Sequence, residues 1–145
     1  YYGDEAGLCG WTDPDNRRAY PWGNEDKDLI EYHKVLISLH KECQALKTGS
    51  IMFLHGGYNL ICYGRFDEKD KVVVIINRDE AEREIHIPVW RLGIKYQSRM
   101  ARIFRTDREG FFDETQMYVV DNGYIHVNCP GVSGIILKNM EDTAY

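Results

Sequence analysis

The residues best suited to chemistry lie in one irregular stretch near the start of the chain, residues 11–23. It reads Trp-Thr-Asp-Pro-Asp-Asn-Arg-Arg-Ala-Tyr-Pro-Trp-Gly and combines carboxylates, two guanidinium groups and three aromatic rings. Aromatic faces stack on the C–H groups of sugars, and carboxylates and arginines hydrogen-bond to sugar hydroxyls, so this composition fits a saccharide site. An alternative needs no ligand: Asp13 and Arg17 form a salt bridge that shapes the loop, and the Trp rings pack underneath. The residues alone leave both interpretations open.

The adjacent carboxylates Asp4 and Glu5 are a second candidate for catalysis. Retaining glycoside hydrolysis uses two carboxyl groups about 5 Å apart on one face of a site. Neighbours in an extended segment point to opposite faces, so the pair is poorly placed to act as acid and nucleophile. We therefore expect Asp4 and Glu5 to make ordinary structural hydrogen bonds.

The histidines and cysteines show no recognised metal or redox spacing. None of the five histidines forms an HxH or HExxH set, and we expect His33 and His40 on the polar edge of a helix. The cysteines include no CxxC pair and are expected to be buried small hydrophobes in a reducing compartment, which mildly favours the cytoplasm. Their even number also permits two disulfides. The four are Cys9, Cys43, Cys62 and Cys129.

The overall composition limits the classes of partner. The 145 residues are 43% hydrophobic and 28% charged, enough for a sizeable core and unlike a disordered chain. The net charge of −5 argues against nucleic acid or an anionic membrane as a partner. No apolar run approaches the roughly 18 residues of a membrane span. Because the chain opens on Tyr1-Tyr2 rather than Met, we expect it to be a piece of something longer.

A helical pattern follows the irregular stretch, over residues 26–47. Apolar residues recur there at steps of three and four and form a broad stripe that must pack on a substantial partner. Asn24 is the expected N-cap, and we expect the helix to end before Gly49. The stripe comprises Leu29, Ile30, Tyr32, Leu36, Ile37, Leu39, Cys43 and Leu46.

The rest of the chain shows β patterns separated by turn residues. Asn122-Gly123 is the preferred pair for a type I′ hairpin turn between two of the expected strands. Short strands at this spacing predict an antiparallel sandwich or barrel of roughly 80–90 residues. The expected strands are 51–54, 60–66, 72–76, 85–89, a weaker one at 99–104, 118–120, 124–127 and 135–137.

The first residues also resemble a known family. Tyr1-Tyr2-Gly3-Asp4-Glu5-Ala6-Gly7-Leu8, then Asp13-Pro14-x-x-Arg17 and Tyr20-Pro21-Trp22, resemble the final barrel segment of α-amylase-type enzymes of glycoside hydrolase family 13. The similarity is greatest to the neopullulanase, cyclomaltodextrinase and maltogenic amylase group. It implies a mostly β fold: a C-terminal, Greek-key-like antiparallel β-sandwich (50–145) preceded by a loop and one long helix. That loop and helix (1–49) would be the last βα unit of a truncated (β/α)8 barrel.

The resemblance also implies which roles this chain can carry. In the neopullulanase group the Asp and Arg of the DPxxR loop contact glucose on the non-reducing side of the cleaved bond, a substrate-binding role that Asp13 and Arg17 would inherit. The family's nucleophile, acid/base and transition-state carboxylates lie upstream, so no residue here is assigned to catalysis and the chain is expected to be inactive alone. We assign it no metal and no cofactor.

Three roles are open to such a piece, and we favour the first. The first is a non-catalytic domain of an α-glucan-cleaving enzyme that shields and stabilises the barrel. The second is an α-glucan-binding module. The third is a purely structural domain, in which the helix stripe (Leu29, Leu36, Leu39) would be exposed and drive self-association. The aromatic residues that the second role would use are Tyr58, Tyr63, Phe66, Trp90, Phe111 and Phe112.

Overall fold

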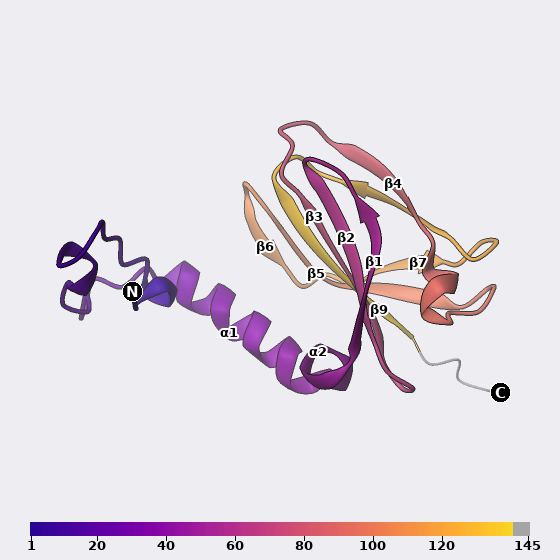
Figure 1. Cartoon of the computed structure of the whole chain (residues 1–145), viewed down its shortest axis with the longest axis horizontal. Helices are drawn as coiled ribbons and strands as arrows, with labels where there is room; N and C mark the ends of the chain where they lie inside the picture. Colours follow the sequence, from indigo (N-terminus) through magenta and orange to yellow (C-terminus); the bar gives the residue numbers. More distant parts are fainter. Residues whose placement is uncertain (141–145) are drawn as a thin grey trace. The chain divides into compact units, whose positions relative to one another are not determined.

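The computed structural model describes residues 1–140 and divides the chain into two compact units (Figure 1). The first comprises Tyr1–Glu42, and the second begins at Cys43. Within the described residues, no helix is both long enough and apolar enough to cross a membrane.

The first unit contains two single 3-10 turns and one long helix. The turns are η1 (Asp4–Ala6) and η2 (Asp15–Arg17), and the helix is α1 (Lys27–Glu42). Asp26, rather than the expected Asn24, caps α1: its Oδ1 accepts the Leu29 N–H at 3.0 Å. The carboxylate satisfies one of the amides that a helix N-terminus leaves unpaired. No residue of α1 is buried, so its apolar stripe has no full cover in this structure.

The expectation of one continuous helix over residues 26–47 is wrong at Cys43. This residue is extended (φ −104°, ψ 114°) and separates α1 from a five-residue helix, α2 (Gln44–Thr48). The Asp70 carboxylate accepts the Gln44 N–H at 3.0 Å and so caps the new helix from a distant part of the chain. Three- and four-residue spacing continues through Cys43, so periodicity could not reveal the break.

The second unit is an antiparallel β-sandwich, which confirms the expected fold class. Its larger sheet has seven strands in the order β1-β2-β3-β9-β5-β6, with β7 also pairing with β5. The smaller sheet consists of β4 and β8. The strands are β1 (Ser50–Gly56), β2 (Leu60–Phe66), β3 (Lys71–Asn77), β4 (Arg83–Ile87), β5 (Arg99–Asp107), β6 (Gly110–Phe112), β7 (Gln116–Val119), β8 (Ile125–Cys129) and β9 (Ser133–Asn139).

The β-branched run of β3 is buried on both faces of the larger sheet. Val73 and Ile75 belong to the main core, together with buried residues of the smaller sheet such as Ile85 and Val127. Val72 lies on the other face, in a small cluster with Cys43 and Ala45 of the α2 region. Apolar cover on both faces over residues 72–75 explains a continuous rather than alternating apolar run there, whereas Ile76 at the end of the run is exposed.

The predicted turn at Asn122-Gly123 has the expected conformation but a different role. Both residues have positive φ, 48° and 85°, as a type I′ turn requires, and Asp121 and Tyr124 form a single β-bridge. The flanking strands then separate: β7 pairs with β5 in the larger sheet, and β8 pairs with β4 in the smaller one. The turn connects the two layers rather than the arms of a hairpin.

Most strands begin or end one or two residues from the expected positions, and the notable differences are at the ends of β4 and β5 and in one additional strand. Val89 lies in a 3-10 turn, η3 (Val89–Leu92), that follows β4. β5 runs on to Asp107, and the short strand β6 after it was not expected at all. Gly110 opens β6, and glycine is a poor strand former, which explains why the pattern gave no signal there.

Candidate functional site

The loop that contains Asp13 and Arg17 brings these two side chains together. Arg17 Nε lies 3.3 Å from Asp13 Oδ1, and the Arg17 guanidinium stacks over the Tyr1 ring at 4.3 Å. Both side chains are well exposed, 70% for Asp13 and 56% for Arg17. The 3-10 turn η2 reverses the chain direction after Asp13 and so brings the Arg17 side chain close to the Asp13 carboxylate. The salt bridge of the ligand-free alternative is thus present, and both groups remain accessible to a ligand.

A second ion pair, Asp15 with Arg18, also shapes this loop. Arg18 donates from Nε and Nη2 to the two Asp15 oxygens at 2.9 Å each, and the Trp11 N–H donates to Asp15 at 2.8 Å. These bonds, the Arg18 pair first, hold the pKa of Asp15 below its usual value. The Tyr2 hydroxyl donates to the Arg18 carbonyl at 2.9 Å and ties the loop to the first residues.

The two tryptophans of the loop are exposed, contrary to the alternative that packs the Trp rings underneath. Trp11 and Trp22 are 81% and 80% exposed. Tyr20 lies against Trp22, with ring centroids 4.6 Å apart. Burial, with the charges of Glu5 and Glu25, raises the pKa of the Tyr20 phenol, which therefore stays a neutral hydrogen-bonding group. Exposed rings beside a carboxylate–guanidinium pair form a surface suited to sugar hydroxyls and C–H faces.

Asp4 and Glu5 do not lie in the extended segment that we expected. They form the 3-10 turn η1 between Gly3 and Gly7, both left-handed at φ 80° and 73°. The Ala6 carbonyl, in the same turn, accepts the Asp26 N–H at 3.1 Å at the start of α1. The glycine positions that permit this turn were visible in the sequence as Gly-x-x-x-Gly.

The cysteines match the expectation except at Cys9, which is exposed. All four are free thiols, and the other three are buried. Burial raises the pKa of Cys62 to about 12 and of Cys129 to about 11, so these thiols stay protonated and act as small hydrophobes.

The aromatic residues of the sandwich offer few positions for stacking on a sugar. Tyr58 and Trp90 are 96% and 56% exposed. The remaining four candidates, Tyr63, Phe66, Phe111 and Phe112, are half-buried on their strands.

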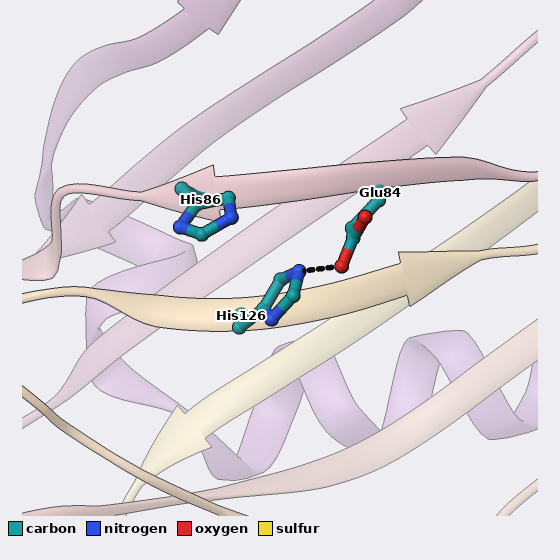
Figure 2. Close-up of side chains that lie close together, drawn as sticks. All are labelled: Glu84, His86 and His126. Carbon is teal, nitrogen blue, oxygen red and sulfur yellow. Dashed lines mark ion pairs between the residues drawn. The ribbon is translucent and has the colours of Figure 1, made fainter.

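One cluster of chemically active side chains was not predicted. Glu84 and His86 on β4 and His126 on β8 lie together on the smaller sheet, as Figure 2 shows. His126 Nε2 pairs with the Glu84 carboxylate, and the His86 and His126 rings stack with centroids 4.2 Å apart. The only local signal was the spacing Glu84-x-His86, which places two ligands on one face of a strand. His126 joins them through the β4–β8 pairing, which no local pattern indicates.

No protein-family model matches the chain. Curated relatives do: it is 33% identical to an amylopullulanase of Thermoanaerobacterium saccharolyticum over 94% of its own length, which is 11% of that protein. It is 39% identical to a cyclomaltodextrinase of Geobacillus thermopakistaniensis over 61% of the chain and 16% of the relative. The chain thus spans about a tenth of the length of the amylopullulanases and about a sixth of the cyclomaltodextrinases.

Solved structures show the same fold. An α-amylase from Geobacillus thermoleovorans, solved with acarbose, aligns with a TM-score of 0.82 at 21% identity, covering 99% of this chain and 29% of that one. A cyclomaltodextrinase aligns with a TM-score of 0.73 at 25% identity, covering 97% and 22%. The sequence relatives and the shared fold together show that the chain belongs to the α-amylase-type glycoside hydrolases of family 13 and corresponds to a C-terminal domain of such proteins.

Proposed function

We propose that this chain is the non-catalytic C-terminal part of an enzyme that hydrolyses α-1,4 or α-1,6 glucosidic bonds with retention. The observation that carries the proposal is its relationship, over 94% of its length, to amylopullulanases many times longer. In this scheme residues 1–49 are the end of a catalytic barrel and residues 50–145 are an accessory sandwich. The acid and nucleophile belong to the preceding part of the polypeptide.

We propose that Asp13 and Arg17 bind α-glucan in that enzyme. Supporting this role, both side chains are exposed and paired with each other, so neither is committed to a buried structural bond. A carboxylate accepts and a guanidinium donates, so together they can hold two hydroxyls of one glucose unit. Trp11, Tyr20 and Trp22 supply aromatic faces in the same loop.

The partner of α1 is the barrel of the same polypeptide. Apolar side chains at Leu29, Leu36 and Leu39 recur on one face of this helix, and none of them is fully buried. The accessory sandwich covers and stabilises one side of that barrel. Four exposed apolar residues on β1–β3 are available for such a contact: Ile51, Phe53, Ile61 and Ile76.

The test compares the 145-residue chain with the longer polypeptide, each assayed on soluble starch and pullulan. We expect turnover only from the longer protein, in which Asp13→Ala and Arg17→Ala lower kcat/KM by about tenfold or more through loss of charged hydrogen bonds to substrate. The matched control is another exposed acid–base pair of the same unit, Glu31 with Lys34. Glu31→Ala and Lys34→Ala should leave kcat/KM unchanged.

Two results would contradict the proposal. Glycosidase turnover by the 145-residue chain alone would show that the catalytic carboxylates are within it. Unchanged kcat/KM in both Asp13→Ala and Arg17→Ala would remove these residues from the substrate site. Light scattering tests the role of α1: the chain alone should self-associate, and Leu36→Glu with Leu39→Glu should make it monomeric.

A further inference from the structure

We propose that Glu84, His86 and His126 form a binding site for a divalent transition-metal ion such as Zn²⁺. The site lies on the smaller sheet of the sandwich, outside the loop of Asp13 and Arg17 (Figure 2). It is independent of the α-glucan proposal, because every residue it uses belongs to β4 and β8.

The strand alternation places all three side chains on one face. Along β4, Ile85 and Ile87 are buried while Glu84 and His86 are exposed, and along β8 the exposed His126 lies between the buried Ile125 and Val127. The inward residues anchor the sheet in the core, so the outward residues cannot rotate as a group without a change of register. The backbone positions of the ligands are therefore set before any metal arrives.

The strand pairing brings the ligands within reach of one ion. His86 and His126 are direct cross-strand partners, and Glu84 is two residues from His86 on the same face. One ligand atom from each of the three side chains lies within 4.8 Å of the other two. Ligands of one tetrahedral Zn²⁺, bonded at about 2.0–2.2 Å, are roughly 3–4 Å apart. Because the nitrogen lone pairs lie in the planes of the stacked imidazole rings, the two histidine side chains must rotate out of the stack to bind one ion, while the backbone stays in place.

The donor set selects the class of metal. Two imidazoles and a carboxylate suit Zn²⁺, Cu²⁺ and Ni²⁺, whereas Ca²⁺ and Mg²⁺ prefer sites made of oxygen donors. Three protein ligands leave at least one coordination position for water or another small donor. The side chains of His126 and Glu84 are 49% and 61% exposed, so an ion can reach them from solvent.

The surroundings of the ligands include one supporting amide and two opposing cations: Arg102 and Arg105 line the same cavity and repel a metal ion, although both guanidinium groups already bond to other side chains. Glu84 and His126 line a cavity of about 400 Å³, whose wall also includes Asn128, the cross-strand partner of Glu84. An amide at that position can hydrogen-bond a ligand or a bound water, the outer contact that metal sites commonly use. Without an ion the same cluster is a plain cross-strand contact between an imidazole and a carboxylate, and this is the alternative that the experiment must exclude.

The experiment is calorimetric titration of the 145-residue chain with ZnCl₂, in a Cys9→Ser background because Cys9 is an exposed thiol that could bind zinc itself. We expect one saturable site per chain and an increase in the unfolding temperature on adding Zn²⁺, since the folded state alone holds the three ligands together. Imidazole ¹⁵N signals of His86 and His126 should shift together at one equivalent.

Three variants test the assignment, and a fourth is the control. His86→Ala and His126→Ala each remove a metal ligand. Loss of a residue that only hydrogen-bonds a ligand typically weakens metal affinity about 10–100-fold, so loss of the ligand itself should weaken Zn²⁺ binding by at least as much. Glu84→Gln should weaken it by about tenfold. His55→Ala changes another exposed strand histidine of the same unit and should bind Zn²⁺ like the parent. All four substitutions are on the surface, and circular dichroism verifies that the sandwich remains folded.

Two outcomes would overturn the site. Absence of saturable binding at millimolar ZnCl₂ would leave the cluster as a cross-strand polar contact. Binding that is unchanged in the double variant His86→Ala, His126→Ala would place the metal elsewhere. Neither outcome bears on α-glucan hydrolysis, which is measured on the longer polypeptide.

Discussion

Two carboxylates with lowered pKa values, Asp15 and Asp70, show how differently the two units are held together. Asp15 bonds to Arg18 and to the Trp11 amide, both within four residues of it. Asp70 bonds to Lys138 Nζ at 2.9 Å and to the Gln44 N–H at 3.0 Å, and so connects β9, α2 and the β2–β3 turn. Local bonds shape the loop of the first unit, whereas bonds between distant residues unite the second.

The same contrast appears in the apolar residues. In the first unit the buried residues are few, Gly3 and Ala6, and the aromatic side chains lie largely at the surface. In the second unit a continuous core joins the two sheets, and a smaller cluster lies under α2. Because burial of apolar area is the main source of stability, the second unit should unfold cooperatively by itself, and the first should depend on outside contacts.

The largest expected effect is at Asn77, which connects the two sheets. Its Nδ2 donates to carbonyls of Ala81, Cys129 and Pro130, and its Oδ1 accepts the Asp79 N–H at 3.0 Å. Asn77→Ala removes a hydrogen bond to the buried Cys129 carbonyl and three to partly buried groups, and it should lower the free energy of unfolding by about 2–3 kcal/mol. Urea denaturation followed by fluorescence measures the change.

The control for Asn77 is an asparagine of the first unit. Asn24 is exposed, and Asn24→Ala should leave the urea midpoint unchanged. Equal losses in the two variants would mean that both units unfold together and share their stability.

A smaller effect is expected at Gly123, in the turn that connects the layers. Its φ is +85°, and an added Cβ would lie 2.9 Å from Trp90 Cβ. Gly123→Ala should lower the free energy of unfolding by about 1–2 kcal/mol, because alanine is strained in the left-handed conformation. It should also shift Trp90. Thermal unfolding monitored by circular dichroism measures the loss of stability.

Gly23 provides the matched substitution in the first unit. It has a similar φ of +79° but nothing within 4 Å of an added Cβ. Gly23→Ala carries the same backbone strain in a loop outside the sandwich, so the sandwich should unfold at an unchanged temperature. An unchanged unfolding temperature in Gly123→Ala would show that the turn can relax without disturbing either sheet.

The sequence allowed the parts that depend on local pattern to be predicted. Strands β2 and β3 and the conformation of the Asn122-Gly123 turn follow from spacing or turn chemistry, and the Asp13–Arg17 pair was one of the two interpretations of its loop. The break at Cys43 did not follow, because it depends on a cap from Asp70. The Glu84, His86 and His126 cluster did not follow either, because the pairing of β4 with β8 joins segments about 40 residues apart. Contacts between residues distant in the sequence, which local patterns cannot predict, also stabilise the second unit.

The smallest expected change in the free energy of unfolding is at Asp70. The hydrogen bond from Lys138, followed by those from Cys43 and Gln44, holds the pKa of Asp70 below its usual value. A lowered pKa in the folded state means that Asp70 stabilises the fold above the pKa of the unfolded chain, near 3.9, and that this contribution disappears as pH falls through the folded value. Asp70→Asn should therefore cost about 1 kcal/mol at pH 7, and the difference from the parent should shrink below pH 4.

Asp15→Asn distinguishes the two kinds of carboxylate. Solvent screens the exposed Asp15–Arg18 pair, and the loop it shapes lies outside the sandwich core, so the sandwich should unfold at the same urea concentration at every pH. If Asp15→Asn shifted that midpoint as much as Asp70→Asn does, the loop would be coupled to the core. If the two profiles separate only above pH 4, a less exposed ion pair between distant residues stabilises this protein where an exposed local pair does not.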